Sequence, residues 1–169
     1  MRLLALPLAF ALAVTPALAA VPAPHVKTQS FDNLAKPLPL PYDEQANGMA
    51  AVAKARAKAR AAHKLLLVDL GGNWCLDCRI LAGTVDLPEV KAWLDRHYTM
   101  VTVDVGRFDK NLDVQAHYGI TGRLEGVPSL LVIDPRSDKL INEGRTAALS
   151  DARHMSPQGL ADYLAQWAK

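Results

Sequence analysis

The two cysteines of this chain, Cys75 and Cys78, stand three positions apart and carry its most distinctive chemistry. Two thiols at this Cys-x-x-Cys spacing can close a small disulfide ring or bind a metal ion. The apolar run 65–68 before the pair predicts a strand, and the residues after it predict a helix. A thiol that opens a helix is activated, because free N–H groups and the helix dipole favour its thiolate.

The first 19 residues predict a secretory signal peptide. Arg2 is followed by an apolar segment over 3–14 and then by 16–19, Pro-Ala-Leu-Ala, which fits an Ala-x-Ala cleavage pattern. The apolar segment is too short to span a bilayer. We therefore expect a cleaved leader over 1–19 and an exported protein without stable membrane insertion. The alternative is a short anchor that stays uncleaved.

Export changes how the cysteine pair is interpreted. A disulfide around two intervening residues stabilises a fold little, because the stabilisation grows with loop length. A structural zinc site needs about four ligands. The chain has no second cysteine pair, and its histidines lack ligand spacing (His25, His63, His97, His117 and His154). The pair is therefore interpreted as redox-active, without a metal ion or organic cofactor, while a structural bridge or a metal site stays the alternative.

Length and charge bound the remaining possibilities. About 150 residues follow the predicted leader, which is typical of a single domain. Half of the residues are hydrophobic, so a core can form. A formal net charge of +2 argues against nucleic-acid binding by phosphate neutralisation. The basic residues of 54–60 fall on two sides of an alanine-rich helix, and we assign them no function.

Strands and helices alternate along the chain behind a proline-rich segment. Residues 20–42 hold five of the 11 prolines, which predicts an extended arm or linker. Helices are predicted over 43–62, over 75–82 with Gly83 at the end, over 87–96 and 111–118, and from 156 onward. Strands are predicted over 65–70, 98–105, 129–134 and 139–143. This order predicts an α/β domain over 43–169, with a central mixed β-sheet flanked by helices.

Four features, in the right order, resemble the thioredoxin superfamily. Residues 74–78, Trp-Cys-Leu-Asp-Cys, are similar to the family's Trp-Cys-x-x-Cys site, and Asp69 stands where the family places a buried acid. Residues 126–129, Gly-Val-Pro-Ser, resemble the segment whose proline is cis and faces the disulfide. Gly144 resembles a glycine that lines the same substrate-binding surface. The resemblance covers about residues 45–169 and implies the thioredoxin fold.

The resemblance implies a role for each cysteine and for the acid. Cys75 would be the attacking nucleophile, and Cys78 would resolve the mixed disulfide. Asp69 ends an apolar strand, so if buried it would have a raised pKa and could take the proton from Cys78. The alternative for Asp69 is an acid at the strand end that faces solvent.

The same resemblance implies which residues meet the substrate. Trp74 would shield the active site. A cis peptide bond before Pro128 would expose the backbone groups of Val127 to an extended substrate segment, and Gly144 would border that surface. Recognition would then depend on main-chain hydrogen bonds, with little selectivity for side chains.

Taken together, these features predict a periplasmic thiol–disulfide oxidoreductase that reduces disulfides in exported proteins. A reductase in an oxidising compartment needs electrons, so a membrane-embedded thiol donor is an expected partner. Asp77 should disfavour the Cys75 thiolate, with Arg79 as a partial offset. The potential should then lie nearer the about −270 mV of thioredoxin than the about −120 mV of a strong periplasmic oxidant. The alternatives are a disulfide oxidase or isomerase, a Cu(I)-binding chaperone that uses the same pair, and an interaction module with an inert disulfide.

Two segments depart from the common family pattern. Residues 121–125 lengthen the approach to Val127, and we expect them to border the active site. Residues 145–155 insert a polar loop before the last helix. We interpret this loop as ordinary surface, with a contact to a partner through Arg145, Asp151, Arg153 or His154 as the alternative.

Overall fold

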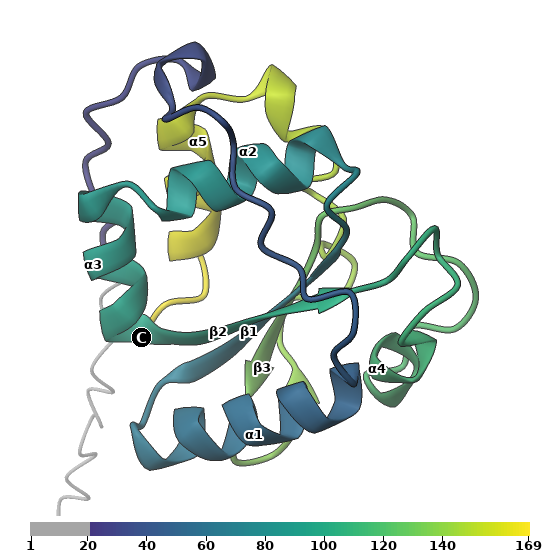
Figure 1. The fold of residues 1–169 in the computed structure, drawn as a ribbon. Coiled ribbons are helices and arrows are strands. Elements are labelled where there is room, and N and C mark those ends of the chain that lie inside the picture. Colours follow the sequence, from purple (N-terminus) through teal and green to yellow (C-terminus); the bar gives the residue numbers. More distant parts are fainter. Residues whose placement is uncertain (1–20) are drawn as a thin grey trace, which may run out of the picture.

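A four-stranded mixed sheet forms the centre of the molecule, in the order β2-β1-β3-β4 (Figure 1). The structure is a computed structural model and describes residues 21–169, so the predicted leader lies outside it. The strands are β1 (Leu65–Gly71), β2 (Tyr98–Asp104), β3 (Ser129–Asp134) and β4 (Lys139–Leu140). β1 pairs parallel with β2 and antiparallel with β3, and β4 pairs antiparallel with β3. The predicted α/β class with a mixed sheet is confirmed.

Strand β1 is buried along its whole length. It has a neighbour on each edge, which accounts for its almost continuous apolar sequence. Its one polar side chain, Asp69, stands opposite Thr102 on β2 and Leu130 on β3. The Asp69 side chain therefore projects from the central strand into the buried interior, near the end of the strand that leads to the cysteines.

Helices cover both faces of the sheet (Figure 1). One apolar cluster contains residues of α1 (Gly48–Ala61) and α4 (Leu112–His117). The other contains residues of α2 (Leu76–Val85), α3 (Pro88–His97) and α5 (Pro157–Ala165). Two short 3-10 helices, η1 (Phe31–Asn33) and η2 (Ala152–His154), complete the described elements. β1 contributes to both clusters, and Cys78 of α2 belongs with Cys75 to the cluster of α1 and α4.

Two helices differ from their predicted bounds by more than one residue. Helix α1 begins at Gly48 instead of residue 43, because the Asn47 side chain caps it by accepting a hydrogen bond from the Ala50 N–H at 2.8 Å. Helix α2 continues through Gly83 to Val85. A Cβ at Gly83 would lie 3.3 Å from side-chain atoms of both Leu34 and Leu38. Glycine at this position therefore leaves room for the arm to pack against the helix, and it does not end the helix.

The last strand is shorter than predicted and ends at Leu140 instead of residue 143. The Asn142 side chain takes over the pairing with β3. Its amide donates to the Leu130 carbonyl at 2.8 Å, and its oxygen accepts from the Val132 N–H at 2.9 Å. The backbone is thereby released to turn away from the sheet.

Residues 21–42 form an extended arm that packs on the domain, apart from the turn of η1. Its apolar side chains Val26, Leu34 and Leu38 are buried in the cluster with α2, α3 and α5. Tyr42, at the end of the arm, is buried in the other cluster. The arm therefore passes from one core to the other before α1 begins, as the dark blue segment in Figure 1 shows.

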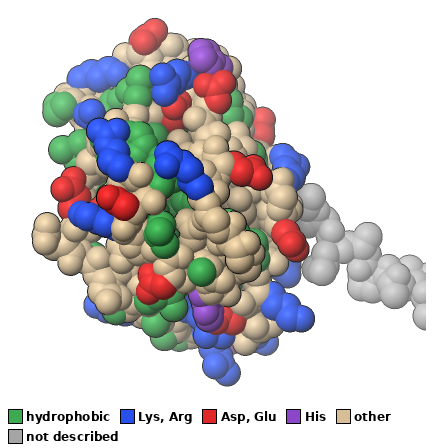
Figure 2. Space-filling view, turned by 90° about the vertical axis from the view of Figure 1, so that its right-hand side faces the viewer, with side chains coloured by type: hydrophobic (Ala, Val, Ile, Leu, Met, Phe, Trp, Pro, Cys, Tyr) green, Lys and Arg blue, Asp and Glu red, His purple; other side chains and the backbone are tan. Residues whose placement is uncertain are grey.

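Charged side chains of both signs are spread over the face drawn in Figure 2, with hydrophobic side chains between them. No single sign of charge covers this face, in keeping with the small net charge. Within residues 21–169, no helix has the length and hydropathy needed to cross a bilayer.

Two leucines of the arm offer a direct test of its packing. Leu38 is 8% exposed and Leu40 is 64% exposed. We expect Leu38→Ala to lower the free energy of unfolding by about 2–3 kcal/mol, because it leaves a cavity in the core. Leu40→Ala, the matched control, should change it by less than about 0.5 kcal/mol. Urea denaturation measures both values, and equal effects would show that the arm contributes no core packing.

Candidate active site

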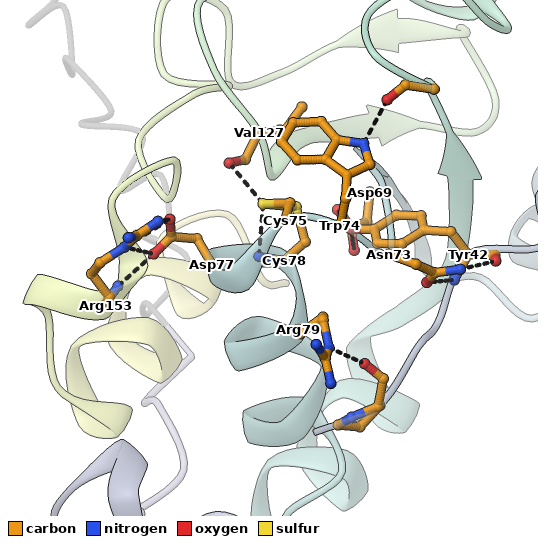
Figure 3. Close-up of a disulfide and its surroundings, with 12 residues drawn as sticks. Tyr42, Asp69, Asn73, Trp74, Cys75, Asp77, Cys78, Arg79, Val127 and Arg153 are labelled. Atoms are coloured by element: carbon orange, nitrogen blue, oxygen red, sulfur yellow. Dashed lines mark hydrogen bonds and ion pairs between the residues drawn. A yellow bond between two sulfur atoms is a disulfide. The ribbon is translucent and has the colours of Figure 1, made fainter. Parts of the chain in front are cut away.

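The two cysteines lie at the start of α2 and form a disulfide with a Cα–Cα separation of 5.3 Å (Figure 3). Cys75 is the N-cap residue, and its sulfur accepts a hydrogen bond from the Cys78 backbone N–H at 3.2 Å. Cys75 is 5% exposed, whereas Cys78 is fully buried. Only the first sulfur can therefore meet another molecule without a rearrangement of the site.

The backbone of Val127 faces the disulfide from the segment that leads into β3. Its carbonyl oxygen lies 3.4 Å from the Cys75 sulfur, and when that cysteine is reduced its S–H can donate to this oxygen (Figure 3). The peptide bond between Val127 and Pro128 is cis. The structure thus brings the sequence-predicted residues Cys75, Val127 and Pro128 together, although they are far apart in the chain.

Asp69 lies behind the cysteines and is almost completely buried. The Tyr42 hydroxyl donates to its carboxylate, at 2.9 Å from each oxygen. Burial raises the pKa of Asp69 to about 7, although the hydrogen bond from Tyr42 lowers it. Burial, together with the neighbouring Asp69, also raises the pKa of Tyr42 far above its usual value, so this tyrosine stays protonated. A carboxyl group with such a pKa can gain and lose a proton near neutral pH.

Tyr42 was not found from the sequence, because it stands in the arm, 27 positions before Asp69. Asp69 is where the resemblance placed a buried acid, and the alternative of an acid facing solvent is wrong. No motif joins the two residues. A tyrosine at the end of a proline-rich segment was the one available signal, and that signal is common in surface loops.

Trp74 covers one side of the disulfide and remains 41% exposed. Its indole N–H donates to the Gly106 carbonyl at 2.7 Å, and the Arg107 guanidinium lies 4.3 Å from its ring centroid. Phe108 packs against it with a centroid separation of 6.1 Å, and Arg123 stacks on Phe108 at 3.9 Å. The segment 121–125 is therefore connected to the tryptophan through one aromatic ring.

Asp77, between the cysteines, is buried and paired with Arg153 from η2. The guanidinium contacts both carboxylate oxygens, and the Arg153 backbone N–H donates to one of them at 2.8 Å (Figure 3). Burial raises the pKa of Asp77, but the hydrogen bonds and charge of Arg153 outweigh it and hold the pKa below its usual value. Interpreting the whole loop 145–155 as ordinary surface is therefore wrong at Arg153.

Arg79 has a different role from the one expected. Its guanidinium donates to the backbone carbonyls of Leu38 at 2.9 Å and Pro39 at 3.2 Å (Figure 3). The partial offset of the Asp77 charge expected from Arg79 comes instead from Arg153. Arg79 binds the arm to the active-site helix.

Gly144 stands in an exposed turn after β4, with a positive φ of 73°. In the part of the chain that the structure describes, no hydrogen bond joins it to the cysteine pair or to Pro128. A Cβ there would meet nothing within 4 Å, so the backbone angle is what favours glycine. Its placement on the substrate-binding surface stays a prediction.

The surroundings of the cysteines contain few ligands for a metal ion. Within residues 21–169, no group of three or more His, Cys, Asp and Glu side chains is placed to hold one. A soft cation would therefore find the two sulfurs as its protein ligands. These are the same sulfurs that form the disulfide.

Comparison with known proteins gives a family and a similar solved structure. Residues 47–135 match the profile of a family described as thioredoxin-like. A disulphide isomerase from Xylella fastidiosa Temecula1 is 37% identical, with a TM-score of 0.69 over 76% of this chain and 97% of that one. No curated protein sequence matches significantly.

Two other solved structures are more distant. A DsbH oxidoreductase is 25% identical, with a TM-score of 0.41 over 53% of this chain and 66% of that one. The oxidised C-terminal domain of DsbD from Neisseria meningitidis is 20% identical, with a TM-score of 0.40 over 57% of this chain and 83% of that one. Likenesses at this level do not inform function.

The Asp77–Arg153 pair generates a prediction about the Cys75 thiol. Without the guanidinium, the Asp77 charge is left uncompensated beside the sulfur and opposes the thiolate. We expect Arg153→Ala to raise the pKa of Cys75 by about 1, measured from the pH dependence of alkylation of the reduced protein. Arg145→Ala removes an arginine of the same loop that stacks on Tyr163 and Trp167 instead, and should leave the pKa unchanged.

A double variant separates this charge effect from a loss of packing. Adding Asp77→Asn to Arg153→Ala removes the uncompensated carboxylate and should restore the pKa of Cys75 to near its original value. A raised pKa that persists in the double variant would contradict the role assigned to the pair.

Proposed function

Since this chain belongs to the thioredoxin-like family and carries the Cys75–Cys78 disulfide at the start of α2, it is a thiol–disulfide oxidoreductase, and we propose that it reduces disulfides in exported proteins. The environment of the Cys75 sulfur supports reduction as the direction of the reaction. One N–H donor faces it at 3.2 Å, and one carbonyl oxygen faces it at 3.4 Å. The donor favours the thiolate, whereas the carbonyl favours the thiol.

This balance supports a reductase over an oxidase. A strong oxidant of this family owes its potential to a stabilised reduced form, with a thiolate of very low pKa. The guanidinium of Arg153 is bound to Asp77, so its positive charge is already neutralised and does not act on Cys75 as a free cation. The helix N-terminus then stabilises the Cys75 thiolate without help from the Arg153 cation, and we expect a moderate potential.

The first step of the proposed reaction takes place at Cys75. Its thiolate attacks one sulfur of a substrate disulfide, which forms the Cys75–substrate bond and releases the other substrate sulfur as a thiolate. We propose that Val127 and Pro128 hold an extended substrate segment beside Cys75 through main-chain hydrogen bonds. Trp74 would shield the mixed disulfide from one side, and Gly144 would border the same surface.

The second step takes place at the buried Cys78. Its thiol gives a proton to the Asp69 carboxylate, and the resulting thiolate attacks the Cys75 sulfur. The Cys75–Cys78 disulfide forms, the substrate leaves as its second thiolate, and two electrons have passed to the substrate. The raised pKa of Asp69, about 7, supports this acceptor role because the carboxyl group can take up a proton near neutral pH.

We propose that the protein works in the periplasm after its leader over 1–19 is cleaved. Each turnover leaves the cysteine pair oxidised, so a reductant must regenerate it. In an oxidising compartment, a membrane-embedded thiol protein is the reasonable donor. Disulfide-containing exported proteins are then the substrates.

A second candidate is disulfide isomerisation. The name of the Xylella fastidiosa protein, a disulphide isomerase, favours it, since the likeness covers 76% of this chain and 97% of that one. Isomerisation uses the same attack by Cys75 but returns the substrate with rearranged disulfides. The potential of the cysteine pair distinguishes the two candidates.

The test of the proposed direction is the reduction potential of the Cys75–Cys78 pair, equilibrated against glutathione. We expect a value near the about −270 mV of thioredoxin. Cys78→Ser cannot form the internal disulfide, so it is the control that assigns the measured potential to this pair. A value near about −180 mV would favour the isomerase, and one near about −120 mV would contradict reduction in favour of oxidation.

A further inference from the structure

We propose that Tyr42, from the N-terminal arm, is a positioning residue of the redox site, and that its hydroxyl holds the Asp69 carboxylate ready to receive the proton of Cys78. This inference rests on the proposed function in one respect, the role of Asp69 as proton acceptor. It adds that residues 21–42 belong to the redox machinery, although they precede the part of the chain that matches the family profile.

The hydrogen bond from Tyr42 is the first ground for the inference. Its hydroxyl oxygen lies 2.9 Å from both carboxylate oxygens of Asp69. Within residues 21–169, no other hydrogen-bond donor reaches this side chain. Both residues are buried, so solvent cannot take the place of the hydroxyl. Tyr42 therefore sets the orientation of the carboxylate and favours its charged form.

The position of Cys78 is the second ground. A Cβ at Gly71 would lie 2.3 Å from the Tyr42 hydroxyl oxygen and 2.9 Å from the Cys78 sulfur. The oxygen and the sulfur are then no farther apart than the sum of these two distances. Asp69 and Gly71 are two positions apart on β1 and face the same side of the sheet. The Tyr42 hydroxyl therefore lies close to both the Asp69 carboxylate and the resolving sulfur.

The anchoring of the arm is the third ground. Asn73 accepts a hydrogen bond from the Tyr42 N–H at 3.1 Å and donates to the Tyr42 carbonyl at 2.9 Å. On β2, the Thr102 hydroxyl donates to the Pro41 carbonyl at 2.8 Å. Arg79 binds the backbone carbonyls of Leu38 and Pro39. Asn73 and Arg79 flank the cysteine motif, so the active-site segment itself fixes Tyr42.

The ionisable groups around this pair are few. The arm contributes Tyr42, and α2 contributes Cys78. On β3, the residue opposite Asp69 is the apolar Leu130. Asp104 on β2 acts on Tyr42, and its carboxylate lies 3.4 Å from the Lys110 ammonium. Because the hydrogen bond from Tyr42 lowers the pKa of Asp69, its loss should raise that pKa further.

The test follows the two chemical steps separately. Reduced protein is mixed with a symmetrical aromatic disulfide that releases one coloured thiolate at each step. The first release reports attack by Cys75, and the second reports displacement by Cys78. Stopped-flow absorbance then gives the pH profile of each phase. Tyr42→Phe keeps the ring and removes the hydroxyl.

We expect Tyr42→Phe to move the midpoint of the second phase to higher pH. At a pH below that midpoint, the second phase should slow about tenfold, the size expected for one hydrogen bond to a charged group. The first phase should keep its rate and pH profile. Tyr118→Phe is the matched control, because it removes a buried hydroxyl bound to another carboxylate, Asp138, and should change neither phase.

Several outcomes would overturn the inference. An unchanged midpoint, or equal slowing of both phases, would make Tyr42 merely structural. If Tyr42→Phe does not fold, Asn73→Ala loosens the arm and should give a smaller shift in the same direction, while no shift there would overturn the inference. Absence of the first phase would instead contradict the proposed function. In Asp69→Asn, adding Tyr42→Phe should produce no further shift, and a further shift would count against the inference.

Discussion

The burial of one carboxyl group, Asp69, is the constraint on which the rest of the site depends. An ionisable group in the buried interior is costly unless a hydrogen bond compensates it. Here the compensating donor is the Tyr42 hydroxyl, which comes from outside the sheet and its helices. The arm must therefore be held in place. Leu34 and Leu38 pack into the core, and the Arg79 guanidinium binds backbone carbonyls of the arm. The site and the N-terminal arm form one structural unit.

Two acids close together in the chain reach opposite states, because their partners offset the cost of burial to different extents. Asp69 is buried beside a neutral hydroxyl, and its pKa rises to about 7. Asp77 is buried beside the Arg153 guanidinium, and its pKa falls below its usual value. Burial raises the pKa of both acids, and the Tyr42 hydroxyl offsets it only in part at Asp69. The Arg153 cation outweighs it at Asp77, because a cation stabilises a carboxylate more than a hydroxyl does. Asp69 can therefore exchange a proton near neutral pH, while Asp77 stays ionised and neutralised by its partner.

Local patterns predicted much of the fold and the motif at its centre. The apolar run of β1, the alanine-rich α1 and the cysteine spacing each depend on residues close together in the chain. The long-range partners could not be predicted in this way. Tyr42 reaches Asp69 across 27 positions and Arg153 reaches Asp77 across 76 positions. Polar residues at such distances leave no periodic signal, so Arg153 was interpreted as surface and Arg79 was given the wrong partner. The prediction that Gly83 ends the helix was wrong for a related reason, since glycine is required there by the arm that packs against it.

The most direct measurement is the titration of the Asp69 carboxyl group itself, by carbon NMR of the oxidised protein. In that form the cysteines do not titrate, and Asp69→Asn identifies the signal. The expected midpoint is about 7, with the group protonated below it and ionised above it. A midpoint near the ordinary value of 3.8 would show that burial does not control this carboxyl group, and it would contradict the role of Asp69 as the proton acceptor of the redox pair.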